Sequence, residues 1–175
     1  RSFRRKLDDQ KALAPARPGV GKSGLKLPAG VKTGEKILMF LENKTGKAAG
    51  VTDFNLLSIP YRAVATDINT GKAVVIGSGN LATAMRASMA IPGAFTPVDI
   101  DGKLLVDGGM VNQVPVDVVR AMGADIVIAV DVGTPLGEID STTNLLKIAD
   151  QVIGFLTVGN TEETVAALRK QDILI

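Results

Sequence analysis

The segment Asp125–Val132 (DIVIAVDV) constrains the fold of this sequence more than any other segment. It is a nearly continuous run of apolar, mostly β-branched residues, which is typical of a strand covered on both faces in a largely parallel sheet. Helical patterns flank it: Val116–Met122 lies before it, and Leu145–Leu156 and Thr161–Lys170 follow it. The apolar residues 173–175 predict the start of another strand. This alternation of helices and strands predicts an α/β fold.

Further elements are predicted nearer the start of the chain. Glu35–Asn43 has the spacing of a short amphipathic helix, and Leu81–Ala90 is rich in Ala and Met, as a buried helix would be. Tyr61–Ile68 and Ala73–Ile76 flank a Gly-containing loop and predict an antiparallel hairpin. Leu104–Val106 predicts a short apolar strand.

The chain divides by composition into a flank and a domain. Residues 1–34 are basic and rich in Gly and Pro, and the ordered domain is predicted to comprise residues 35–175. Residues 1–50 hold 12 Lys/Arg against 4 Asp/Glu, and residues 51–175 hold 8 against 14, which gives +8 and −6. A solvated arm is the preferred interpretation of the flank, and contact with an anionic membrane surface stays open.

His and Cys are absent from the sequence, and this removes whole classes of chemistry. The chain cannot assemble a Ser-His-Asp triad or a His-ligated zinc site, and it has no thiolate nucleophile or Cys-ligated metal. We therefore expect no metal and no cofactor. Because only 3% of residues are aromatic and Trp is absent, stacking on single-stranded nucleic acid is disfavoured as well.

Two glycine-containing segments resemble nucleotide-binding motifs. Gly19–Ser23 (GVGKS) resembles the end of a P-loop, but no apolar strand precedes it and Pro28 blocks the helix that should follow. Gly77–Ala82 (GSGNLA) lies between a strand and a helix, as a dinucleotide fingerprint does. Its strand belongs to the predicted hairpin, so turn and cap glycines are preferred, and nucleotide binding is the less favoured alternative.

Asp107, Gly108 and Gly109 follow the predicted strand Leu104–Val106 directly. A carboxylate at a strand end, followed by glycines that permit unusual φ values and close backbone approach, is a plausible place for a catalytic group. Taken alone, Asp-Gly after a strand is more often an ordinary turn. The motif gains weight from the segments around it.

These segments, in their order along the chain, resemble the bacterial patatin-like phospholipases, which are related to plant patatin, neuropathy target esterase and cytosolic phospholipase A. The resemblance covers roughly residues 53–134. The segments that carry it are Ala63–Asp67 with the following Thr70-Gly71, Arg86–Phe95, Leu105–Asp117 and Met122–Asp131.

The resemblance implies a three-layer α/β/α fold and a Ser-Asp dyad. In this family the serine lies in a G-x-S-x-G elbow, a Gly-rich loop supplies oxyanion-hole N–H groups, and the aspartate comes from a D-G-G/A motif. Asp107 with Gly108 and Gly109 matches that motif. A dyad without His suits this chain, because a carboxylate in a low-dielectric site can take the serine proton. The implied function is lipid acyl hydrolysis of phospholipids or other acyl esters.

The sequence departs from the family pattern in one respect: it contains no G-x-S-x-G. Ser23 lacks the second glycine of the elbow, and Ser88 lies inside a predicted helix, so neither is a convincing nucleophile. We expect the serine on a missing N-terminal part of the same protein, a domain incomplete at both ends, and no activity of this chain alone. The alternative is an inactive patatin-like module that binds a membrane or a protein partner.

Other acidic residues receive structural interpretations. Asp67 is predicted to brace the hairpin turn, Asp117 to be an exposed charge in the first turn of a helix, and Asp131 to have a capping or supporting role. The compartment stays open between the cytoplasm and an outer-membrane or secreted location, since the resemblance includes relatives fused to export modules.

Overall fold

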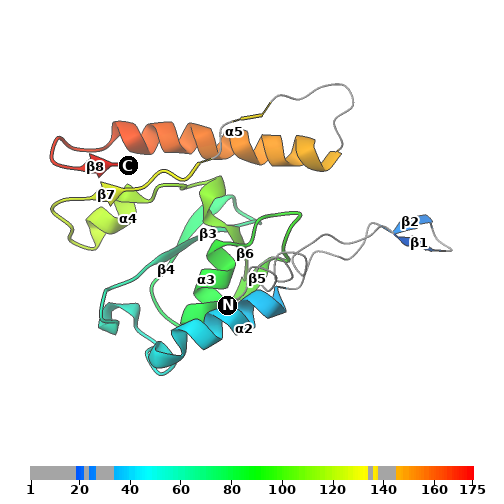
Figure 1. Ribbon diagram of the computed structural model, residues 1–175, viewed down its shortest axis with the longest axis horizontal. Helices are drawn as coiled ribbons and strands as arrows, with labels where there is room; N and C mark the ends of the chain where they lie inside the picture. Colours follow the sequence, from blue (N-terminus) through cyan, green and yellow to red (C-terminus); the bar gives the residue numbers. More distant parts are fainter. Residues whose placement is uncertain (1–18, 22–23, 27–33, 134–135, 138–144) are drawn as a thin grey trace, which may run out of the picture.

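The computed structural model describes residues 19–21, 24–26, 34–133, 136–137 and 145–175. Figure 1 shows two groups of elements, with α5 running along one side above β7, β8 and α4, and the larger sheet with α3 and α2 on the other side. The mixed α/β class predicted from the sequence is confirmed. Two short strands, β1 (Gly19–Gly21) and β2 (Gly24–Lys26), pair within the flank that was predicted to be loop.

The larger sheet has four strands in the order β4-β3-β6-β5, and all of its pairs are antiparallel. Its strands are β3 (Ala63–Asp67), β4 (Lys72–Ile76), β5 (Val98–Ile100) and β6 (Lys103–Asp107). The predicted hairpin is confirmed as β3–β4, in which Gly71 adopts φ 65°. The register pairs Ala65 with Asp107, which places the end of β6 beside the middle of β3.

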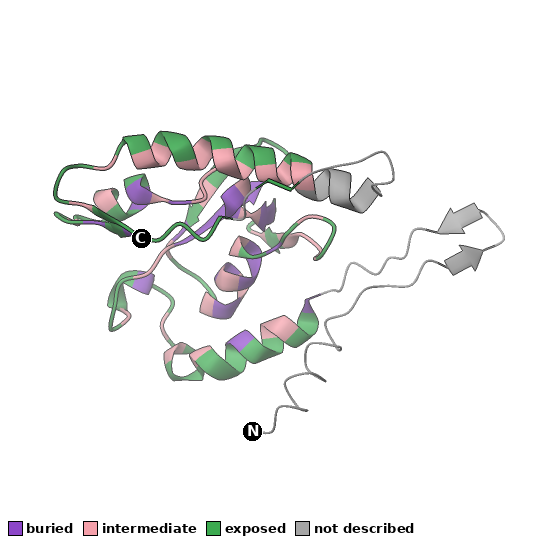
Figure 2. Cartoon of the chain, turned by 45° about the horizontal axis from the view of Figure 1, so that its top comes forward, coloured by how far each residue is buried: buried purple, intermediate pink, exposed green. Residues whose placement is uncertain are grey.

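Two helices cover this sheet in succession: α3 (Leu81–Ser88) packs on β3 and β6, and α2 (Glu35–Thr45) packs on α3. Alanines on the buried side of α3 let the helix approach the strands closely, because they add little side-chain bulk. Figure 2 shows buried residues gathered in the sheet and α3. The core cluster consists of Phe54, Ala63, Ala65, Ile76, Ala84, Ala87 and Leu105.

Short 3₁₀ turns connect these elements: η1 (Gly46–Ala48), η2 (Phe54–Leu56) and η3 (Gly108–Met110). In η2, Asp53 caps the turn by accepting the Asn55 N–H, and Phe54 is fully buried. The turn η3 follows β6 directly and begins the loop that carries the glycine pair.

The second group contains α4 (Val116–Ala121), β7 (Ile128–Ala129), α5 (Leu145–Ala166) and β8 (Ile173–Leu174). Strands β7 and β8 pair in parallel. A small core of Val114, Val116, Val127 and Ala129 lies beneath them. Asp172 connects three segments of this group, because its carboxylate accepts the Val127 and Arg169 N–H groups and pairs with Arg120 of α4.

Two sequence predictions require correction here. The run Asp125–Val132 yields only the two-residue strand β7, and its residues alternate: Val127 and Ala129 are buried, whereas Ile128 is 61% exposed and Val132 76% exposed. One face of the run is therefore covered, and the larger sheet is antiparallel instead of parallel. The two helices predicted around residue 158 are one continuous helix, α5.

Candidate active site around Asp107

Asp107 is the last residue of β6, and its backbone is fixed on both sides. Its N–H donates to the Ala90 carbonyl at 3.1 Å, and its carbonyl accepts the Thr66 hydroxyl at 2.8 Å. The carboxylate oxygen Oδ1 accepts the Gly109 N–H at 2.8 Å. Among the described residues none donates to Oδ2, so one carboxylate oxygen is held and the other is available.

Each glycine after Asp107 is explained by a close approach. A Cβ on Gly108 would collide with the Val64 carbonyl of β3, and a Cβ on Gly109 would collide with the side-chain oxygen of Gln113. Neither residue has a positive φ. The prediction of close backbone approach is confirmed, and the prediction of unusual φ values is wrong at this motif.

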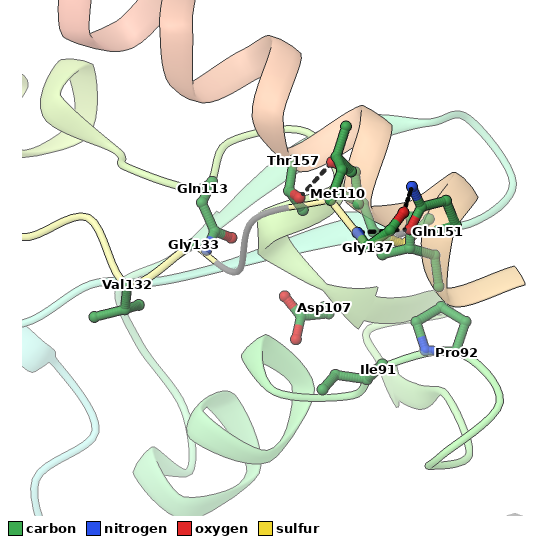
Figure 3. A pocket seen from close by; sticks show the side chains of 13 residues that line it. Ile91, Pro92, Asp107, Met110, Gln113, Val132, Gly133, Gly137, Gln151 and Thr157 are labelled. Carbon is green, nitrogen blue, oxygen red and sulfur yellow. Dashed lines mark hydrogen bonds between the residues drawn. The ribbon is translucent and has the colours of Figure 1, made fainter. Parts of the chain in front are cut away.

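The Asp107 carboxylate faces a cavity of about 390 Å³. Figure 3 shows this carboxylate between Ile91 and Pro92 on one side and Gln113 and Val132 on another. Among the described lining residues Asp107 alone carries an ionisable side chain. The lining consists of Ile91, Pro92, Asp107, Met110, Gln113, Val132, Gly133, Leu136, Gly137, Gln151, Ile153, Gly154 and Thr157.

Burial raises the pKa of the Asp107 carboxyl, and the Gly109 N–H opposes this by favouring the charged form. Burial is the larger of the two causes, because an apolar wall solvates a carboxylate poorly. A carboxylate with a raised pKa is a stronger base than an ordinary aspartate. The site therefore places a carboxylate of increased basicity beside a cavity lined by both apolar and polar groups.

The remaining acidic residues take structural roles in the described structure. Asp67 accepts the Asn69 N–H and the Thr70 hydroxyl, which braces the β3–β4 turn as predicted. Asp117 lies in the first turn of α4 and accepts the Asn112 amide. Asp131 accepts the Gly133 N–H, a local capping bond.

The other motifs of the sequence do not join this site. Asn80 caps α3 by accepting the Thr83 N–H, Gly79 adopts φ 98°, and the preceding strand β4 is an edge strand, which favours turn and cap glycines for Gly77–Ala82. Ser88 does not line the cavity of Asp107. Ser23 and the end of the P-loop-like segment lie outside the described residues.

Sequence reasoning missed two polar residues that hold the loop. Thr66 bonds the Asp107 carbonyl from β3, and Asn160 reaches the loop from α5 by bonding the Gly109 carbonyl and the Gln113 N–H. Asn160 lies 51 positions after Gly109. No local pattern marks such a contact, because it depends on where α5 packs.

Within the described residues, no cluster of acidic side chains suits a metal ion, and no helix is long and apolar enough to cross a membrane.

Comparison with known proteins gives this site a family. The family described as patatin-like phospholipase matches residues 7–120. An uncharacterized NTE family protein of Mycobacterium bovis is 43% identical over 102 residues, which cover 58% of this chain and 27% of that protein. Patatin-like phospholipase domain-containing protein 7 of mouse is 46% identical over 101 residues, which cover 57% of this chain and 7% of that protein.

The chain belongs to the patatin-like phospholipase family, as the sequence resemblance implied. The family is one of lipid hydrolases. Patatin-like phospholipase domain-containing protein 6 of mouse is also similar, at 40% identity over 101 residues. Each match extends over only a small share of the relative, about a quarter of the mycobacterial protein and less of the animal ones.

Proposed function

We propose that this chain supplies the catalytic aspartate, Asp107, of a lipid acyl hydrolase with a Ser-Asp dyad. The serine lies on an N-terminal part of the same protein outside these 175 residues, because this sequence contains no G-x-S-x-G. The substrate is a phospholipid or another acyl ester, and this chain by itself is inactive. The observation that carries the proposal is the Asp107 carboxylate, which is oriented by Gly109 and faces a cavity with both apolar and polar lining residues.

In the proposed reaction the carboxylate of Asp107 takes the proton of the serine hydroxyl while the serine oxygen attacks the acyl carbonyl carbon. The ester C–O bond then breaks, and the departing alcohol oxygen receives the proton from Asp107. In the second half, water attacks the acyl-enzyme, and Asp107 takes a proton from that water. The fatty acid leaves as the serine oxygen regains its proton, so the enzyme returns to its starting state.

Three properties of the site suit this reaction. Among the described residues the Gly109 N–H alone bonds the Asp107 carboxylate, at Oδ1, which leaves Oδ2 to face a hydroxyl. The raised pKa of Asp107 makes the carboxylate a stronger proton acceptor. The apolar side chains of Ile91, Val132 and Leu136 provide a surface for an acyl chain.

The test is hydrolysis of a short-chain fluorogenic ester by the longer protein that contains this chain, with and without Asp107→Asn. Asn keeps an oxygen that accepts the Gly109 N–H, but it cannot take a proton at neutral pH. We expect a loss of kcat of at least about a thousandfold, the scale of removing a group that acts as a unit with its nucleophile. The matched control is Asp99→Asn in β5, where the exposed Asp99 carboxylate accepts the Gly102 N–H.

The separated 175-residue chain tests the location of the serine. We expect no turnover from it, and turnover after mixing only if a serine-bearing piece is added. Robust hydrolysis by the chain alone would refute the external serine, and full activity of Asp107→Asn would refute the dyad.

The second candidate is a non-catalytic family member that binds a membrane or protein partner. The basic first 50 residues, with 12 Lys/Arg against 4 Asp/Glu, favour it together with the absent serine elbow. Sedimentation with anionic phospholipid vesicles separates the candidates, because charge-driven binding weakens as salt screens it. Salt-sensitive binding in a longer protein without ester hydrolysis would favour this second candidate.

A further inference from the structure

Asn160 lies within the long helix α5, a position where its residue type needs an explanation. Asn is a poor helix former, because its short amide competes with the backbone for hydrogen bonds. Gly159 precedes it, and both residues fall between the predicted helices Leu145–Leu156 and Thr161–Lys170, yet α5 continues from Leu145 to Ala166. Asn160 therefore lowers the intrinsic stability of the helix at this position.

Both ends of the Asn160 amide reach out of the helix to the loop after Asp107. The oxygen Oδ1 accepts the Gln113 N–H at 2.9 Å, and the nitrogen Nδ2 donates to the Gly109 carbonyl at 3.0 Å. Nδ2 also bonds the Leu156 carbonyl one turn earlier in α5, at 2.8 Å. One side chain thus spans the loop at two points and is fastened to its own helix at a third.

Gly109 connects this clamp to the carboxylate. Its carbonyl accepts from Asn160, and its N–H donates to Oδ1 of Asp107. The two peptide groups on either side of the Gly109 Cα are therefore both held, one by α5 and the other by the carboxylate. Gln113 closes the same loop, since its side-chain oxygen occupies the place of a Gly109 Cβ.

We propose that Asn160 is a positioning residue, which holds Gly109 so that its N–H orients the Asp107 carboxylate toward the cavity. The proposal rests on the proposed role of Asp107. It also makes α5 part of the functional site, because the helix supplies both the clamp and the cavity residues Gln151 and Thr157. Movement of α5 would then change the orientation of the base.

A purely structural role for Asn160 predicts something different. If the amide only docks α5 on the domain, its removal lowers the thermal midpoint and leaves the carboxylate unchanged. If it positions Gly109, its removal also weakens the Gly109 N–H bond to Asp107. Since that bond lowers the pKa of Asp107 against the effect of burial, the pKa should then rise further.

The experiment compares wild type, Asn160→Leu, Asn160→Asp and Thr164→Val in the 175-residue chain by NMR. Leu has a similar size and no hydrogen-bonding group. Asp keeps an acceptor for Gln113 and loses the donor to Gly109. Thr164→Val is the matched control, because the Thr164 hydroxyl bonds only the Asn160 carbonyl within α5. The first readout is the pKa of the Asp107 carboxyl group, followed by the chemical shift of its carboxyl carbon. This signal is assigned by its loss in Asp107→Asn. The second readout is hydrogen exchange of the Gly109 amide.

We expect Asn160→Leu to raise the pKa of Asp107 and to speed exchange of the Gly109 amide by about fivefold to tenfold, the factor for losing roughly one hydrogen bond. Asn160→Asp should speed the same exchange, and it serves as the test if the Leu variant does not fold. Thr164→Val should change neither readout. Unchanged Gly109 exchange in both Asn160 variants would overturn the proposal. Neither readout requires turnover. Absence of ester hydrolysis by the longer protein would refute the proposed function, and the NMR test of Asn160 would still give a result.

Discussion

The four-stranded sheet and the β7–β8 pair differ sharply in how they bury their apolar residues. All residues of β3 are buried, and Leu105 of β6 is fully buried between the sheet and α3. In the β7–β8 group the core consists of three valines and one alanine, and Ile128 is 61% exposed. Described residues 151–166 of α5 contain no fully buried side chain, as the absence of purple there shows in Figure 2.

The two groups therefore obtain their stability in different ways. The sheet with α3 and α2 covers its own apolar face, so burial of side chains stabilises it. The β7–β8 pair relies more on polar contacts, chiefly the Asp172 carboxylate with its backbone and Arg120 partners. Asp107 and its cavity lie where the two groups meet, since the lining includes residues of both.

The largest loss of unfolding free energy should follow from a cavity in the core of the larger sheet. Leu105→Ala removes a fully buried side chain, and we expect it to lower the free energy of unfolding by about 2–5 kcal/mol. Urea denaturation followed by the fluorescence of Tyr61, which packs beside Phe54 with ring centroids 6.0 Å apart, measures it. A loss below about 1 kcal/mol would show that the two groups are less different than their burial suggests.

A somewhat smaller effect is expected from Gly108→Ala, because the new Cβ collides with the Val64 carbonyl. Overpacking of this kind costs about 1–3 kcal/mol, and the displaced loop should also disturb Asp107. Gly46→Ala is the control, since a Cβ there meets nothing within 4 Å and φ is −53°. Equal unfolding free energies for the two variants would contradict the close fit of Gly108 against β3.

Acid should loosen the β7–β8 group selectively. The N–H groups of Arg169 and Val127, and the charge of Arg120, lower the pKa of Asp172. A lowered pKa gives stability that is complete above the ordinary Asp pKa of about 3.9 and is lost as pH falls through the folded value. Hydrogen exchange should therefore accelerate in β7 and β8 before the larger sheet on acidification.

Asp172→Asn is the matched variant for this acid test. It removes the titrating carboxylate and should make exchange in β7 and β8 faster at neutral pH and nearly independent of acid. Simultaneous loss of protection in both sheets of the wild type would argue that the whole domain responds as one unit.

Asp107→Asn should have a smaller effect on stability, with the opposite sign. The folded state binds the Asp107 proton more tightly because burial raises the pKa of this carboxyl, so wild-type stability falls as pH rises from about 3.9 to that raised value. The Asn variant avoids this loss. Its Tm should exceed that of wild type at pH 7, and the difference should shrink toward pH 3, as thermal unfolding followed at both pH values would show.

Asp99→Asn provides the comparison for this prediction, because Asp99 is an exposed residue in the middle of β5 that accepts the Gly102 N–H. A lower Tm for Asp107→Asn than for wild type at pH 7 would mean that the carboxylate stabilises the loop more than burial penalises it.

The smallest effect is expected from Ile128→Ser on the exposed side of β7. Its side chain is largely in water, so the free energy of unfolding should change by no more than about 0.5 kcal/mol. Light scattering of concentrated samples should show less self-association, since the variant interrupts a row of exposed apolar side chains. A loss comparable to that of Leu105→Ala would remove the contrast between the two groups.

The hairpin β3–β4, the helices α2, α3 and α4, and the position of Asp107 at the end of β6 could be predicted from local patterns. Periodicity, a loop glycine and flanking breakers determine such elements over a few residues. The extent of β7 could not, because the apolar run Asp125–Val132 reports a preference for burial and does not say which neighbours are present. The continuity of α5 through Gly159 and Asn160 was missed because the clamp lies 47 or more positions away in sequence.

Residue identity and order are enough to recognise the family, the aspartate motif and the lack of His in these 175 residues. Tertiary packing, by contrast, explains why Gly108 and Gly109 are glycines, which oxygen of Asp107 is held, and how α5 fastens the loop. Each of these is a contact between distant segments, and its geometry is set by packing that no local stretch of sequence encodes.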